Sequence, residues 1–230
     1  MAYPATLFGV NTDADLEKLA SQFSKFSLFR SEIEFLGKKF QLGLKIENME
    51  KSQNSLSLIV SDSFVSAVKI NEDILKLPVT RRTPLSFIQI GADLYLVVFS
   101  RKKEAEKLAD TLSEELFKKP DVIYRLVIPS QALSKIYRSE NIEVKQIVYE
   151  STSSEEEIKT TVYFGRNLAS VLPRGEKEKS IKIKYILYRD EVGVFGISAS
   201  GTVIAYTQIS QSEFVSYIVE KIIPLAEPPS

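Results

Sequence analysis

The chain has 230 residues, of which 44% are hydrophobic and 26% are charged, as is typical of a globular protein that buries a core. It contains no histidine, no cysteine and no tryptophan. These absences exclude catalysis by a histidine base or a cysteine thiolate, and they exclude disulfide bonds and thiolate zinc sites. The 30 basic and 30 acidic side chains cancel, so net charge does not indicate a polyanion as the partner.

The first ten residues, MAYPATLFGV, have neither the basic start nor the long apolar stretch of a secretory signal. The longest apolar run, residues 94–99, is far too short to span a bilayer. We therefore expect a cytoplasmic protein that makes no membrane contact. We also predict neither a cofactor nor a bound metal ion. The many lysine and glutamate residues are typical of a thermophilic source.

The first predicted helix follows Thr12, where Asp15 three residues later resembles a capping box. Strands are expected next, because apolar and polar residues alternate over residues 33–46 and again over residues 56–58. Residues 94–99 are apolar without interruption, which predicts a strand in the middle of a sheet.

A second helix is predicted after Ser100 as its N-cap, and Pro120 lies just beyond its end. A shorter helix is expected after Ser130. Alternation over residues 181–185 predicts a half-buried strand, and the apolar residues 203–206 predict a central one.

The last predicted helix begins with a capping box made of Ser210 and Glu213, and its apolar stripe runs to Leu225. The expected fold class is therefore α+β. Mainly antiparallel strands should form one sheet or two, with long amphipathic helices packed on one face.

The two ends of the chain match when the sequence is shifted by 110 residues. Gly91 then falls on Gly201, and Ser100 falls on Ser210. We therefore expect two half-repeats, residues 1–119 and residues 120–230, each with the order strand, helix, strands, helix. Whether these halves form one continuous saddle-like domain stays open.

Residues 198–222, SASGTVIAYTQISQSEFVSYIVEKI, resemble the end of a repeat of the TATA-binding-protein family, in which a Phe-Ala-Ser-Gly turn leads into a strand and a long helix. The resemblance is specific over residues 181–226 and implies a saddle of two tandem repeats. The phenylalanine that wedges between bases in that family is Ser198 here, and the corresponding residue of the first half is Ile88. The resemblance therefore implies a fold, and not the kinking of DNA.

A second pattern, Pro120-Asp121 followed by Glu143-Val144-Lys145, resembles the signature of PD-(D/E)xK nucleases. The resemblance implies that Asp121 and Glu143 bind Mg²⁺ through oxygen ligands, while Lys145 activates water or stabilises charge. The alternative interpretation is a proline that ends a helix, followed by a solvated aspartate and a surface Glu–Lys pair.

A basic stretch runs from residue 166 to residue 189. Cations and aromatic side chains on one sheet face could bind phosphates and stack on bases, whereas the alternative is an ordinary solvated surface. The candidate nucleic-acid-binding residues are Arg166, Arg174, Lys177, Lys179, Lys182, Lys184 and Arg189.

The sequence thus favours a non-catalytic binding protein that uses an open sheet face. Its partner is a protein or a nucleic acid, and a homo-oligomer also stays open. The alternative function is a metal-dependent nuclease that uses the carboxylates described above. Apolar side chains gathered on the open face would favour a protein partner.

Overall fold

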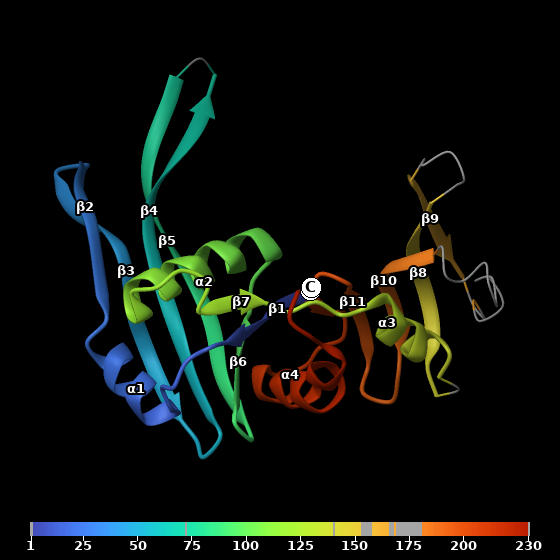
Figure 1. Cartoon of the computed structure of the whole chain (residues 1–230). Helices are drawn as coiled ribbons and strands as arrows, with labels where there is room; N and C mark the ends of the chain where they lie inside the picture. The colour runs from blue at the N-terminus through green and yellow to red at the C-terminus, as the bar shows by residue number, and fades with distance from the viewer. Residues whose placement is uncertain are drawn as a thin grey trace. The chain divides into compact units, whose positions relative to one another are not determined.

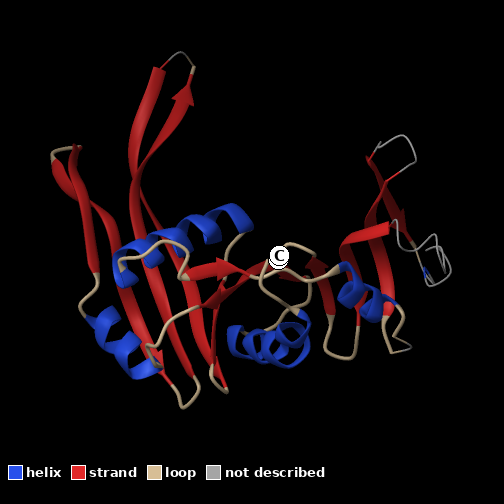
Figure 2. Ribbon diagram, in the orientation of Figure 1, coloured by secondary structure: helices blue, strands red, loops and turns tan. Residues whose placement is uncertain are grey.

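The computed structural model of the chain describes residues 2–71, 73–139, 141–152, 158–165, 168 and 181–229. Strands account for 53% of the described residues and helices for 24% (Figure 2). The expected α+β fold with long amphipathic helices is therefore wrong, because the structure is mostly antiparallel sheet. The described α-helices are α1 (Leu16–Ser24), α2 (Lys102–Phe117), α3 (Ser130–Tyr137) and α4 (Gln211–Tyr217).

The last helix shows why the helices are shorter than their apolar stripes suggest. α4 ends at Tyr217 and continues as a π-helical turn, Ile218–Ile222, and a 3-10 turn, Ile223–Leu225. Pro224 has no amide hydrogen, and its ring would clash with the carbonyl four residues earlier in an α-helix. The apolar stripe therefore continues to residue 225 while the regular helix does not.

The two predicted capping boxes have different outcomes. At α4 the prediction is confirmed, because Ser210 Oγ accepts from the amide of Glu213 and Glu213 Oε2 accepts from the amide of Ser210, at 3.2 and 2.9 Å. At α1 the predicted cap is wrong. Asp15 itself is the N-cap and accepts from the amide of Lys18 at 2.8 Å, while Thr12 accepts from the amide of Ala14.

The chain forms two compact units. We call residues 9–100 and 104–123 the N-terminal unit, and residues 1–8, 101–103 and 124–230 the C-terminal unit.

The N-terminal unit contains a five-stranded antiparallel meander in which each strand pairs with the next. Its core lies under α1, where the ring of Phe23 packs 5.4 Å from that of Phe87, and Leu56 and Leu58 are buried. Its strands are β2 (Ser27–Phe35), β3 (Lys38–Lys51), β4 (Ser55–Ile70), β5 (Asp73–Ile90) and β6 (Asp93–Val98).

The C-terminal unit contains an antiparallel sheet in which the chain order is not kept, because β10 pairs with β8 and leaves β9 outside. A row of fully buried side chains crosses this sheet at Ile147, Ile186, Ile197 and Val203. In spatial order the strands are β1 (Tyr3–Val10), β12 (Thr202–Ala205), β11 (Val194–Ser198), β10 (Ile181–Arg189), β8 (Glu143–Thr152) and β9 (Ile158–Phe164).

The order of elements repeats along the chain. Among the described elements, a strand, a helix, five strands and a helix lead from β1 to α2, and the same series leads from β7 (Ile123–Arg125) to α4. Gly91 and Gly201 occupy corresponding hairpin turns, and both have positive φ, 61° and 72°. The strand pairing of the halves differs as described above, and the resemblance to TATA-binding-protein repeats stays a prediction.

Within the described ranges, no helix is both long enough and apolar enough to cross a membrane.

Candidate functional site

The predicted basic stretch is only partly visible. Arg166, Arg174, Lys177 and Lys179 lie outside the described residues. The other three cations, Lys182, Lys184 and Arg189, are carried by β10.

Two lysines of β10 flank one carboxylate. Lys182 lies opposite Glu150 in the register of β8, and a β-bulge inserts Lys184 after Ile183, so that its ammonium reaches the same Glu150 carboxylate at 2.8 Å. The charge of Lys184 is therefore balanced within the sheet. This local pairing weakens the case for phosphate binding at Lys184.

The three residues of the nuclease pattern lie in different surroundings. Asp121 belongs to the N-terminal unit and is exposed in a turn, with φ of 59°. Burial raises the pKa of Asp110, and the negative charges of Glu106 and Asp121 raise it further. Glu143 and Lys145 lie on β8 in the C-terminal unit and form an ion pair with each other. Among the residues that the structure describes, no group of three carboxylates could hold a metal ion. The nuclease hypothesis stays an untested prediction.

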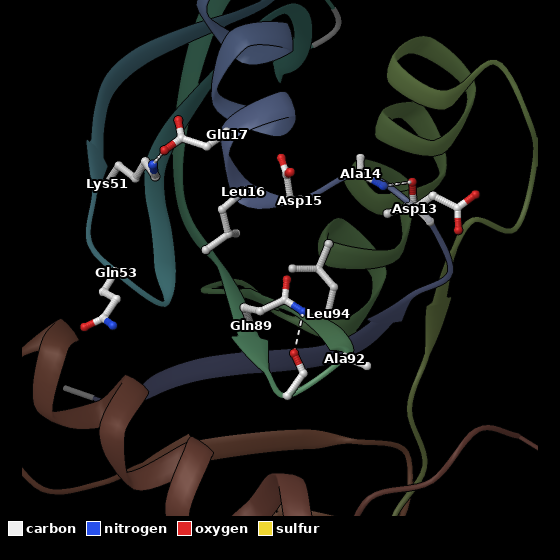
Figure 3. A pocket seen from close by; sticks show the side chains of 12 residues that line it. Asp13, Ala14, Asp15, Leu16, Glu17, Lys51, Gln53, Gln89, Ala92 and Leu94 are labelled. Carbon is white, nitrogen blue, oxygen red and sulfur yellow. Dashed lines mark hydrogen bonds and ion pairs between the residues drawn. The ribbon is translucent and has the colours of Figure 1, made fainter.

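A cavity of about 540 Å³ lies at the start of α1 (Figure 3). Its wall carries three carboxylates, from Asp13, Asp15 and Glu17, and one cation, Lys51, which is paired with Glu17. Asp15 already caps the helix. Carboxylates at a helix N-terminus repel anionic ligands, so this cavity does not resemble a phosphate site.

The outward face of the C-terminal sheet carries two rows that are mainly apolar. One row of register partners contains Val162, Val148 and Tyr185 and ends at Ser198. In the next row Phe164, Leu187 and Ile204 alternate with Gln146 and Gly196. Phe164 is 72% exposed and Val162 43% exposed, and the other four side chains are half-buried. We call these six residues the uncovered face.

Helix α4 packs on the opposite side of this sheet. Its residues Phe214 and Tyr217 stack on Phe195 of β11, with ring centroids 6.2 and 3.9 Å away. Because successive residues of a strand point to opposite faces, Phe195 lies on the other side of the sheet from Gly196. A β-carbon at Gly196 would lie 2.1 Å from the hydroxyl of Tyr185, so that ring lies flat along the uncovered face.

The rim of the uncovered face is polar. Lys184 and Glu150 pair at one end, and Glu143 and Lys145 pair at the other. The hydroxyl of Tyr185 lies 3.2 Å from that of Tyr206. Burial raises the pKa of Tyr185, and the hydrogen bond with Tyr206 raises it further, so this side chain is neutral at physiological pH. An apolar centre with a balanced polar rim is the usual composition of a protein interface.

A chain of buried hydroxyls lies beneath the other side of the sheet. Tyr188 and Tyr217 share a hydrogen bond of 2.6 Å, and Tyr217 donates to Asp190 Oδ2 at 2.7 Å. Asp190 Oδ1 accepts from the amides of Val192 and Gly193, which closes the turn between β10 and β11. The hydroxyls of Tyr188 and Tyr217 and both carboxylate oxygens of Asp190 thus have hydrogen-bond partners within the protein. This indicates a structural role for the three side chains.

The hydrogen-bonded hydroxyls of Tyr188 and Tyr217 predict that the folded protein loses stability at alkaline pH. Burial raises the pKa of both Tyr188 and Tyr217 above the ordinary tyrosine value of 10.0. Below pH 10 both hydroxyls are protonated in the folded and unfolded states. Above it only the unfolded state ionises, so each tyrosine lowers the free energy of unfolding by up to about 1.4 kcal/mol per pH unit.

Urea unfolding between pH 8 and 11 measures this dependence. The double variant Tyr188→Phe, Tyr217→Phe should be less stable at pH 8 but should lose less stability up to pH 11. An unchanged pH slope in that variant would contradict the assignment.

No family model matches the chain, and no curated protein matches it. The assignment of function therefore depends on the surfaces described above.

The sequence predicted the strand β10, but it did not predict the apolar residues of the uncovered face that lie on the neighbouring strands. Ile158, Val162 and Phe164 are separated by even numbers of residues, four and two, and so share one face of a strand, which is the signal of a strand with one largely apolar face. That signal could have predicted the apolar row on β9. The partner rows on β8 and β11 depend on pairing between distant segments, which one sequence does not reveal.

Proposed function

We propose that the protein is a non-catalytic interaction protein whose uncovered face binds a protein partner. The observation that carries this proposal is the pair of mainly apolar rows that form the uncovered face. Val162 and Phe164, on the edge strand β9, are its most exposed residues. Contiguous exposed apolar side chains with a polar rim mark interaction sites in soluble proteins.

A protein partner is favoured over a nucleic acid by the charges nearby. The described cations Lys184 and Lys145 each have a carboxylate partner, Glu150 and Glu143. A nucleic-acid surface requires cations free to displace the counterions of phosphates. An aliphatic surface, by contrast, gains free energy from burial against another apolar surface.

The proposal can be tested with peptides selected from a random display library on the wild-type protein. At least one group of peptides should be rich in aromatic and aliphatic residues. For this group, Val162→Asp should weaken binding at least about tenfold, because a carboxylate cannot be buried in an apolar contact without a large desolvation cost.

Phe29→Asp is the matched control, because Phe29 is 62% exposed but lies in the N-terminal unit. Circular dichroism should show that both variants fold. The proposal is wrong if no selected peptide distinguishes Val162→Asp from the wild type, or if Phe29→Asp causes the same loss.

A further inference from the structure

The hairpin of β4 and β5 extends beyond the helices of the N-terminal unit (Figure 1). We call residues 64–79 of this hairpin the arm. The pairing of β3 with β4 ends at Ser63, and β6 pairs with β5 only from Leu85 onward. Within the part of the chain that is described, the arm strands pair only with each other. A two-stranded ribbon of this kind is marginally stable in water, so an additional strand would stabilise it.

The hydrogen bonds at the base of the arm show which peptide groups point outward. The carbonyl of Pro84 accepts from the amide of Phe99 at 3.0 Å, on the side of β5 away from β4. Peptide groups alternate along a strand, and the register of the arm has no bulge. Even-numbered residues of β5 and odd-numbered residues of β4 therefore direct their peptide groups outward.

The two outer edges of the arm differ in proline content. On β5, the outward positions of the arm are Ile74, Lys76 and Pro78, and Pro78 has no amide hydrogen and obstructs the approach of another strand. On β4, the outward positions are Val65, Ala67 and Lys69, and each keeps its amide donor. One edge of the arm is thus interrupted by a proline, and the other is available for pairing along its length.

No described strand pairs with the available edge beyond Ser63. The β2–β3 hairpin and the arm diverge above Ser63 (Figure 1), where Gly43 of β3 has φ of 147°. A cavity of about 140 Å³ lies at this fork, and its wall includes Leu28, Leu42 and Ser63. An apolar side chain of an added strand could enter this cavity.

The two faces of the arm differ in charge. Phe64, Val68, Leu75, Leu77 and Val79 form an apolar face that continues the core side of the sheet, and Val68 and Leu75 are 40% and 42% exposed. On the opposite face lie two exposed lysines.

Those lysines, Lys69 and Lys76, make no ion pair within the described ranges. We propose that the free edge of β4 between residues 64 and 69 binds an extended segment of another protein by strand addition. This segment is apolar on the side of Phe64 and acidic on the side of Lys69. Main-chain hydrogen bonds supply affinity in this mode, and alternate side chains supply specificity.

Charge favours a different protein over a second copy of this chain as the occupant. Pairing of two arms along β4 would place the Lys69 side chains of both copies on neighbouring strands, with a Lys76 side chain one strand further out in each copy. Like charges on adjacent strands destabilise a sheet, whereas an acidic strand would neutralise them. This inference concerns the N-terminal unit and does not depend on the function proposed for the uncovered face.

The probe for this site is a fluorescein-labelled decapeptide of alternating valine and glutamate, and its binding is followed by anisotropy. Ala67→Pro should weaken binding at least about tenfold, because it removes an outward amide and leaves the β4–β5 bonds intact. Ile74→Pro is the matched control, since it changes the edge of β5, and it should alter binding less than about twofold. Lys69→Glu, which introduces no proline, should also weaken binding and should favour a valine–lysine decapeptide.

Amide hydrogen exchange locates the site independently of the variants. The bound valine–glutamate peptide should slow exchange at Val65, Ala67 and Lys69, while exchange at Ile74 should stay unchanged. Absence of binding, equal binding of the valine–lysine peptide, or protection only outside residues 64–69 would overturn the proposal. A wild-type dimer in sedimentation that Ala67→Pro converts to a monomer would also overturn it, since the occupant would then be a second copy.

Discussion

Replacement of Phe195 by alanine should lower the free energy of unfolding by about 3–5 kcal/mol, as expected for loss of a fully buried aromatic ring. Phe195 has no exposed surface and stacks on Tyr217 with ring centroids 3.9 Å apart. Its removal would leave a cavity between the sheet of the C-terminal unit and α4. That cavity cannot close without moving the helix.

Urea unfolding followed by tyrosine fluorescence measures this loss. Phe29→Ala is the control, because Phe29 is 62% exposed and should change stability by no more than about 0.5 kcal/mol. A loss below about 1.5 kcal/mol for Phe195→Ala would show that α4 does not pack on β11 as described.

Gly43→Ala should lower the free energy of unfolding by about 2–3 kcal/mol, through steric overlap and backbone strain. A β-carbon at this position would lie 1.9 Å from the carbonyl oxygen of Leu28, and the φ of 147° disfavours any other residue. Amide exchange should accelerate in β2 and β3 more than in β5.

Gly37→Ala separates strain from overlap. Gly37 also has a positive φ, 72°, but no atom lies within 4 Å of the position of its β-carbon. Gly37→Ala should therefore lower the free energy of unfolding by only about 1 kcal/mol. Equal losses for Gly37→Ala and Gly43→Ala would contradict the close approach of β3 to β2.

Features set by neighbouring residues were predictable from the sequence. The capping box of Ser210 and Glu213 needs residues only three apart, and both are present as predicted. The prediction of the α1 cap failed because Thr12 and Asp15 both offer oxygen acceptors, and the sequence alone does not show that the helix begins at the buried Leu16, directly after Asp15. Pro224 also acts locally, because it prevents a regular α-helix from continuing to residue 225. The apolar stripe nevertheless favoured a helix over these residues in the sequence-based prediction.

Features set by pairing between distant segments were not predictable. The ion pair of Lys184 with Glu150 depends on a bulge in β10 and on the choice of β8 over β9 as its neighbour. A one-residue change of register would move Lys184 to the other face. The arm was missed for the same reason, because the alternation of residues 64–79 does not show where β3 and β6 stop pairing.

The central claim is that the uncovered face binds protein and not nucleic acid. The most direct test is the anisotropy of labelled single- and double-stranded oligonucleotides at several salt concentrations, with wild type and the Lys182→Ala, Lys184→Ala variant. We predict that the double variant binds as the wild type does and that the salt slopes agree. Tight binding by the wild type, with a slope that the double variant reduces by about two, would contradict the claim, because each lysine would then displace roughly one counterion.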